Sequence, residues 1–196
     1  ILGKAPNNNA AKDYVKNIID QASTDHKDVD FRILNLVDYR FSRCFACNVC
    51  PNPQRKDAEY RCINTKDDMA KLYKRLLDND GIVVAGLSME DRGDIDTVYQ
   101  KFVERTRYIR RDNFKLTNRL VMPLSLNEIK ANSLFNTRVL TSFIRHNTIF
   151  HKGLEDYINN GKILVERNKE IKDLFNSFIS QLKELKKGRE KVNIGE

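Results

Sequence analysis

The sequence predicts an α/β protein in which helices cover both faces of a doubly wound, five-stranded parallel sheet. Strand-like and helix-like segments alternate about five times along the chain, which favours this class over a bundle or a sandwich. Residues 82–85 (Ile-Val-Val-Ala) form a β-branched run between Gly81 and Gly86, a pattern typical of a central strand buried on both faces. The 196 residues contain no linker rich in Pro, Gly or Ser, so we expect a single domain over residues 1–196.

The other strands are predicted from short apolar runs. These runs are residues 31–37, 120–122 and 163–165. Pro123 is expected to end the second of them, because proline cannot donate a hydrogen bond to a sheet. Residues 1–2 resemble the end of a strand, and since the chain lacks an initiator Met, we expect that strand to begin before Ile1.

The helices are predicted from apolar residues that recur at helical spacing. They cover residues 10–22, 67–78, 96–107, 134–144 and 168–187. Asn9 is a suitable N-cap for the first helix, and Asp67 and Asp68 complement the positive end of the second. Ligands of parallel sheets bind at the carboxyl ends of the strands, so the loops around residues 3–9, 86–94 and 123–132 are the expected binding loops.

Composition restricts the class of protein. Hydrophobic residues make up 40% and charged residues 32% of the chain, which excludes collagen, low-complexity polymer and wholesale disorder. No apolar run is long enough to span a membrane and no signal peptide is evident, so we expect a cytoplasmic protein without a membrane partner. The 35 Lys and Arg residues exceed the 27 Asp and Glu residues, giving a net charge of +8, which favours anionic partners.

Four cysteines form the most specific pattern. Cys44-Phe-Ala-Cys47-Asn-Val-Cys50-Pro51 places three thiols at intervals of three, and Cys62 follows. Such spacing is typical of iron–sulfur motifs, in which four thiolates hold a [4Fe–4S] cluster and a proline follows a ligand. Zinc bound by four cysteines, and free or disulfide-forming thiols, are the alternatives. The cysteine-rich loop covers about residues 40–66.

Charged residues near the cysteines have two interpretations. Arg43, Arg55, Lys56 and Arg61 would stabilise a reduced cluster, or they would simply keep an exposed loop in solution. Arg105 is expected to pair with Asp94 or Glu104 nearby. Separately, no catalytic triad or carboxylate pair is evident, so no catalytic residue is assigned. The three histidines lack metal-ligand spacing and are expected at the surface; they are His26, His146 and His151.

The order of these motifs supports a resemblance to a known family. After the turn-rich opening and the close-set cysteines come Cys62-Ile-Asn-Thr-Lys-Asp-Asp-Met69, then Asn79-Asp-Gly-Ile-Val-Val84, then Lys101-Phe-Val-Glu-Arg-Thr106. Over residues 1 to about 125 the chain resembles iron–sulfur flavoproteins and their relatives among the flavodoxin-like, NAD(P)H-dependent FMN reductases. The resemblance implies a flavodoxin-like fold, an FMN cofactor, and a cluster that passes electrons to or from the flavin.

The resemblance also implies where FMN binds. The phosphate loop would be Lys4, Pro6, Asn7, Asn8, Asn9 and Ala10, with backbone N–H groups and a helix N-terminus holding the phosphate. Gly86, Leu87, Ser88 and Met89 would lie against the flavin ring, and Pro123, Leu124 and Ser125 would form a third wall. The partner would be NAD(P)H or ferredoxin, and the assembly a homodimer or homotetramer.

The function expected is therefore that of an FMN-dependent oxidoreductase whose iron–sulfur cluster relays single electrons. One alternative is an electron carrier, or a degenerate member of the family, that lacks flavin. Another is a basic nucleic-acid-binding domain with a structural zinc. It rests on Arg107-Tyr-Ile-Arg-Arg111, in which the aromatic side chain would stack on a base, but such arginine runs are usually solvated, and we do not expect nucleic acid as the partner.

Overall fold

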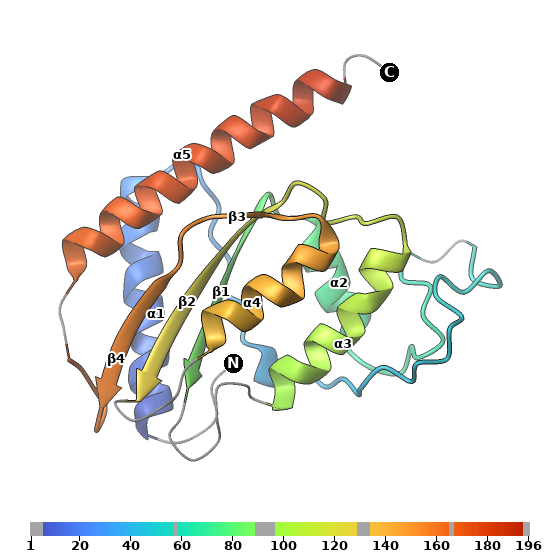
Figure 1. The fold of residues 1–196 in the computed structure, drawn as a ribbon, viewed down its shortest axis with the longest axis horizontal. Coiled ribbons are helices and arrows are strands. Elements are labelled where there is room, and N and C mark those ends of the chain that lie inside the picture. The colour runs from blue at the N-terminus through green and yellow to red at the C-terminus, as the bar shows by residue number, and fades with distance from the viewer. Residues whose placement is uncertain (1–5, 57–58, 89–96, 129–133, 165–166, 194–196) are drawn as a thin grey trace.

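The computed structural model of the chain describes residues 6–56, 59–88, 97–128, 134–164 and 167–193. In these residues a mostly parallel sheet carries helices on both faces (Figure 1). The predicted α/β class is confirmed, and the arrangement is compatible with a flavodoxin-like fold. Among the described residues no helix is both long and apolar enough to cross a membrane.

The sheet is built around one long central strand. Its strands are β1 (Gly81–Ser88), β2 (Leu120–Glu128), β3 (Ile149–Phe150), β4 (Leu154–Asn159) and β5 (Lys162–Ile163). Their order is β1-β2-β4-β5, and β3 pairs with the beginning of β2 while β4 pairs with its end. The strands β1, β3 and β4 run parallel to β2, whereas β5 pairs with β4 antiparallel. The prediction of a wholly parallel sheet is therefore wrong at β5.

The central strand β2 continues through Pro123, which was expected to end it. Beside Pro123, on one side of β2, β3 has already ended and β4 has not yet begun. The Pro123 carbonyl points into this gap, since a Cβ added to Gly153, which lies in the gap, would be 2.8 Å from the Pro123 oxygen. Nitrogen and carbonyl of one strand residue point to the same side. The missing N–H of Pro123 therefore falls where the sheet needs no donor.

The strand β1 lies at an edge of the sheet, although its sequence predicted a central strand. Among the described residues it pairs with β2 alone. Residues 31–37 were predicted as a strand, but they run without ladder bonds into a 3-10 turn, η1 (Leu36–Asp38). A cavity of about 840 Å³ is lined on the two sides by residues 28–36 and 78–86. This cavity explains why both segments are only half-buried despite their apolar sequences.

All five predicted helices are present in the described residues. They are α1 (Pro6–Asp25), α2 (Met69–Leu77), α3 (Thr97–Arg111), α4 (Phe135–Phe143) and α5 (Asn168–Asn193). The described part of α1 already includes Pro6, ahead of the predicted start at residue 10, and proline is tolerated near the start of a helix because it needs no N–H partner there. Asn9 consequently lies inside α1 and is not its N-cap.

The helices form two layers around the sheet (Figure 1). On one face α1 and α5 pack on Leu120, Met122 and Leu124 of β2. On the other face α2, α3 and α4 form a second apolar cluster that includes Val121 of β2. Alternate β2 residues thus point into two cores, which is why the strand is buried almost throughout.

Candidate functional site

The four cysteines lie on one irregular segment between η1 and α2, which runs along α3 at one end of the molecule (Figure 1). All four thiols are free. Cys62 is buried, Cys44 and Cys50 are half-buried, and Cys47 is exposed. The four thiols of the segment therefore differ in exposure, from the buried Cys62 to the exposed Cys47.

The backbone of this segment turns sharply so that amides face sulfur atoms. Ala46 and Asn48 have positive φ angles of 50° and 58°, a conformation that forms tight turns. The Ala46 N–H donates to Cys44 Sγ at 3.4 Å, and the Asn64 N–H donates to Cys62 Sγ at 3.4 Å. These two hydrogen bonds fix the positions of the Cys44 and Cys62 sulfur atoms relative to the turns.

The thiols lie near enough to one another to interact electrostatically. Burial, followed by the charges of Cys62, Cys47 and Cys44, raises the pKa of Cys50 to about 11, while the charge of Arg111 acts in the opposite direction. However, in the part of the chain that the structure describes, no three His, Cys, Asp or Glu side chains are grouped to hold a metal ion. The described side chains therefore form no ready-made site for a metal ion or a cluster, and the binding of either stays a prediction.

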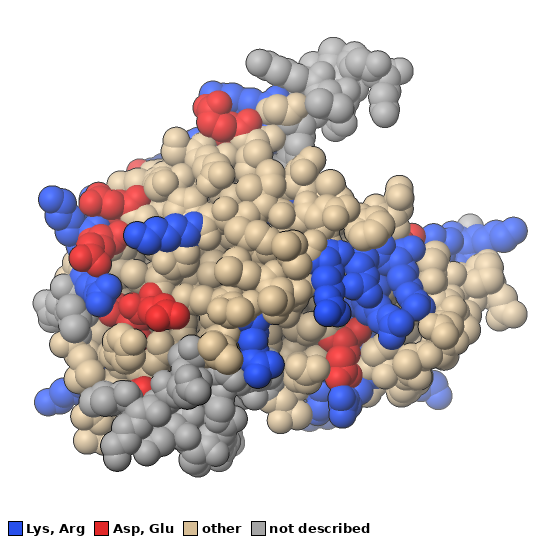
Figure 2. Space-filling model, viewed as in Figure 1, with Lys and Arg blue, Asp and Glu red and all other residues tan. Residues whose placement is uncertain are grey.

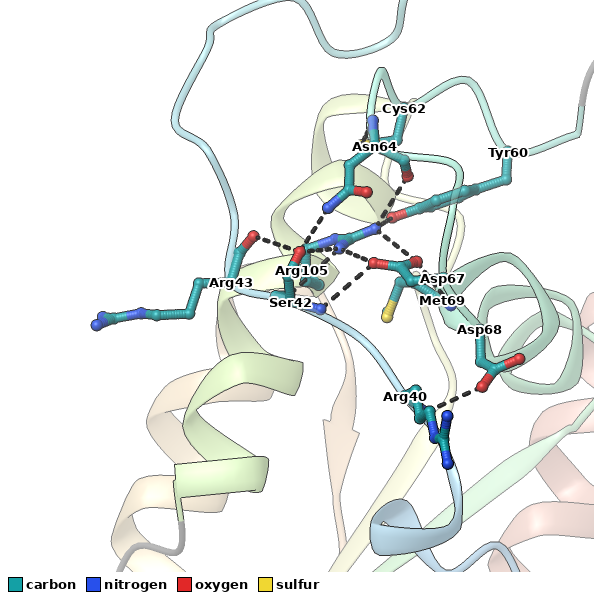
Figure 3. A network of polar contacts seen from close by, with 10 residues as sticks. All are labelled: Arg40, Ser42, Arg43, Tyr60, Cys62, Asn64, Asp67, Asp68, Met69 and Arg105. Atoms are coloured by element: carbon teal, nitrogen blue, oxygen red, sulfur yellow. Dashed lines mark hydrogen bonds and ion pairs between the residues drawn. The ribbon is translucent and has the colours of Figure 1, made fainter.

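Arg105 of α3 anchors the cysteine segment (Figure 3). Its side chain is 2% exposed, and Nη1 lies 2.6 Å from Oδ2 of Asp67. Nη1 also donates to the Ser42 carbonyl at 3.2 Å, and Nη2 donates to Tyr60 Oη at 3.1 Å and to the Asn64 carbonyl at 3.2 Å. One guanidinium therefore ties both ends of the cysteine segment to α3. Arg105 therefore does not pair with Glu104, which pairs with Arg43, and Asp94, the other suggested partner, lies outside the described residues.

The beginning of α2 is joined to the same network (Figure 3). Asp67 Oδ1 accepts the Met69 N–H at 3.1 Å, which agrees with the predicted role of Asp67 at the helix N-terminus. Asp68 accepts the Arg40 N–H at 2.9 Å and donates its own N–H to the Arg40 carbonyl at 2.8 Å. These bonds fix where the cysteine segment starts and where it ends.

A second anchor lies at the other end of α3, around Asp112. This carboxylate is 6% exposed and accepts hydrogen bonds from Arg61 Nη2 at 3.0 Å and from Tyr108 Oη at 3.1 Å, while Lys115 Nζ lies 2.8 Å away. Burial alone would raise the pKa of Asp112, but Lys115, Tyr108 and Arg61 together lower it. The Arg61 N–H donates to Tyr108 Oη at 2.8 Å, so backbone and side chain of Arg61 are both held.

The basic residues around the cysteines mostly serve these local contacts. Arg43 pairs with Glu104 at 2.5 Å, Arg55 Nη1 donates to the Cys62 carbonyl at 3.4 Å, and Arg61 pairs with Asp112. Their positions beside the segment agree with an electrostatic effect on a bound cluster, which stays a prediction.

The expected phosphate loop is largely helical. Pro6 to Ala10 form the first turns of α1, and Lys4 lies outside the described residues. The first backbone N–H groups of a helix have no partner within it and suit an anion. Because α1 contacts β1, β4 and β5, this end of the helix lies close to the carboxyl ends of the strands (Figure 1).

The expected flavin-ring residues lie on neighbouring strands but are mostly inside the sheet. Gly86 of β1 is in register with Ser125 of β2, and Leu124 with Ala85. The segment Pro123, Leu124 and Ser125 is buried within β2 instead of forming a loop after it. Gly86 and Ser88 are buried, Leu87 is half-buried, and Met89 lies outside the described residues. Their contact with a flavin stays a prediction.

Two residues that the sequence placed at the surface are buried. His146, expected to be exposed, is 3% exposed and contacts Thr106 Oγ1 at 3.3 Å. Tyr108, expected to stack on a base, is 2% exposed, and its ring packs edge-on against Tyr60 and Tyr73. Arg105 and Asp112 were not recognised as anchors. The signal for Arg105 was present, because it belongs to the Lys101 to Thr106 motif that supported the resemblance.

Comparison with known proteins gives limited support to the resemblance. No family model matches the chain. Over 92 residues, the chain is 25% identical to a protein of Archaeoglobus fulgidus named iron-sulfur flavoprotein. The matched region is 47% of this chain and 41% of that relative, so the chain spans about two-fifths of the relative's length.

Proposed function

We propose that the chain is a redox protein in which Cys44, Cys47, Cys50 and Cys62 bind a four-iron cluster that exchanges electrons with FMN. The observation that carries the proposal is that all four free thiols lie on one irregular segment, both ends of which are held against α3 by the Arg105 guanidinium. Local amides that donate to the sulfurs of Cys44 and Cys62 support it. The name of the distant relative agrees with it.

A cluster suits these thiols better than a single zinc ion does. Zinc sites usually pair two Cys-x2-Cys units, whereas here three cysteines follow one another at intervals of three before Cys62, as in iron–sulfur motifs. In a four-iron cluster each thiolate binds a different iron, so the four sulfurs lie farther apart than they do around a single metal ion. Four thiolates this close repel one another, and a cationic centre would remove that repulsion.

The residues of the chain would hold and tune such a centre. When bound, the cluster supplies one-electron transfer and FMN supplies two-electron transfer. Arg105 and Asp112 fix the cysteine segment on α3, so that the ligands keep their positions when the charge of the centre changes. The amides of Ala46 and Asn64 offset negative charge on sulfur, which favours the reduced state.

FMN would bind at the carboxyl edge of the sheet. The first turn of α1 would hold the phosphate through backbone N–H groups. Pro123, Leu124 and Ser125 are buried within β2, so in this structure they do not present an open wall to a flavin ring. The donor would be NAD(P)H or a ferredoxin, and the active assembly a dimer or tetramer.

A flavin-free electron carrier is the second candidate. The observation that favours it is the packing of Gly86, where a Cβ would lie 2.3 Å from the Phe135 ring. The absence of a side chain at Gly86 therefore makes room for the Phe135 ring. Contact with a flavin is not needed to explain why a glycine occupies this position.

Anaerobic purification tests the proposal. We expect about four irons and four sulfides per chain, together with FMN, whereas cluster without flavin would support the electron carrier. Cys50→Ser should lose most of the iron, while Gln54→Ser, an exposed position in the same segment, should keep it. One zinc per chain, or equal iron in both variants, would overturn the proposal.

A further inference from the structure

Four arginines gather beside the cysteine segment. Arg107, Arg110 and Arg111 lie on the last turns of α3, and Arg145 lies on the 3-10 turn η2 (Ile144–His146) that follows α4. Figure 2 shows a dense basic patch where these two elements meet. Because α3 contacts η2, Arg145 lies near the arginines of α3; burial, followed by the charges of Arg145, Arg107 and Arg111, lowers the pKa of Arg110.

The charge of this arginine cluster is not compensated within the described residues. None of its members forms an ion pair with a described carboxylate. By contrast, Arg105 of the same helix pairs with Asp67, and Arg43 and Arg61 of the cysteine segment are also paired. Like charges held together repel one another, so an anionic partner would stabilise the arginine cluster.

The arginine cluster is continuous with the cysteine segment. Arg111 Nη2 donates to Oδ1 of Asn48 at 3.0 Å, and Asn48 lies between Cys47 and Cys50. Two apolar side chains close to these residues in the sequence are exposed: Phe45, three positions before Asn48, and Ile144, next to Arg145, are each 62% exposed. Arginine together with exposed apolar side chains is the composition typical of protein interfaces.

These observations favour an acidic protein over a nucleic acid as the partner. The aromatic residue of the basic run, Tyr108, is buried and its hydroxyl is engaged by Arg61 and Asp112. It is therefore not available to stack on a base, as binding of single strands requires. A protein with exposed carboxylates would neutralise the arginines and cover Phe45 and Ile144 at the same time.

We propose that the arginine cluster, with Phe45 and Ile144, is the docking surface for a small acidic protein that carries single electrons. The inference rests on the proposed function, because an electron carrier is expected to bind beside the redox centre, and this surface adjoins the thiols. Docking here would bring the carrier to Cys47, the exposed thiol, through charge complementarity that also speeds the encounter.

Binding of an acidic two-cluster bacterial ferredoxin to the purified full chain tests this proposal. We expect binding by calorimetry at low salt that weakens at physiological salt, and a loss of about tenfold in affinity for the variant Arg110→Glu/Arg145→Glu. The matched control, Lys162→Glu/Lys169→Glu, makes the same change of charge at exposed lysines of β5 and α5 across the sheet. It should change the affinity less than about twofold.

Arg145 is exposed, so Arg145→Glu alone should fold normally and still lose several-fold in affinity. The proposal is overturned if the native chain does not bind ferredoxin, if both double variants lose affinity equally, or if a polythymidine strand binds tighter than ferredoxin does. Iron and sulfide analysis of the same samples separates the two proposals: a chain without a cluster that still binds ferredoxin through Arg145 contradicts the proposed function alone.

Discussion

Arg105 and Asp67 form a buried ion pair between α3 and the segment that leads into α2. Their side chains are 2% and 10% exposed, and Nη1 and Oδ2 are 2.6 Å apart. The hydrogen bond with Asp67 raises the pKa of Arg105 although burial opposes this. Because the same guanidinium also holds Ser42, Tyr60 and Asn64, the position of the cysteines depends on it.

Arg105→Ala should lower the free energy of unfolding by about 3 to 5 kcal/mol, because Asp67 would remain buried and unpaired. Arg105→Lys should also destabilise the protein, since an ammonium group cannot replace a planar fork with several fixed donors. Urea unfolding measures both. Arg75→Ala, at an exposed position of α2, is the control and should stay within about 0.5 kcal/mol of the native chain. Equal stability of the Arg105 and Arg75 variants would contradict the anchoring role.

Gly86→Ala should destabilise the protein by about 1 to 3 kcal/mol. The new Cβ would lie 2.3 Å from Cε2 of Phe135, so the ring would have to move. Phe135→Leu in the same chain should recover part of the loss. Gly188→Ala, where the added Cβ would meet nothing within 4 Å, should instead gain up to about 1 kcal/mol from helix propensity. Thermal unfolding compares the variants, and an unchanged midpoint for Gly86→Ala would refute the clash.

His146 should make the protein less stable in mild acid. Burial, followed by the charge of Arg110, lowers the pKa of His146 to about 4 from its ordinary value of 6.5. The unfolded chain therefore binds more protons between these values, so the stabilising contribution is complete above about pH 6.5 and is lost as the pH falls toward 4. Between pH 7 and pH 5 the loss should be about 2 kcal/mol. Urea unfolding of His146→Gln should show a smaller loss over that range; equal pH dependence in both proteins would rule His146 out.

Tyr108→Phe should loosen the second anchor of the cysteine segment. The change removes the oxygen that accepts the Arg61 N–H at 2.8 Å, which is worth about 1 kcal/mol. Hydrogen exchange of the Arg61 amide should accordingly become about fivefold faster. Tyr157→Phe, at a tyrosine that is 38% exposed on β4, should leave that amide unchanged. Unchanged exchange in Tyr108→Phe would show that the bond contributes nothing.

The helices were predictable because burial on one face repeats with the helical period. In α2 the buried residues Met69, Leu72, Tyr73 and Leu76 follow that spacing. The strand β4 was missed, since its inward residues include Asp156 between Leu154 and Ile158. Tyr14 donates to this buried carboxylate, and a partner so distant in sequence cannot be inferred from a local pattern.

The candidate site was predictable only in part. The spacing of the cysteines correctly placed them on one irregular segment. The ion pairs Arg105 with Asp67 and Arg61 with Asp112 join residues 38 and 51 positions apart, so local charge patterns pointed to the wrong partners. Burial of Tyr108 and His146 likewise depends on how α3 packs against its neighbours, and no single stretch of sequence encodes it.

The anchoring of the cysteine segment by α3 has a practical consequence for protein engineering. Because acceptors for one guanidinium occur both before the first cysteine and after the last, the thiols and the helix form one transferable unit. A designer who moved residues 40–67 alone onto another scaffold would transplant ligands without the clamp that orients them. We expect a graft to keep the orientation of the thiols only when residues 97–112 are transferred together with residues 40–67.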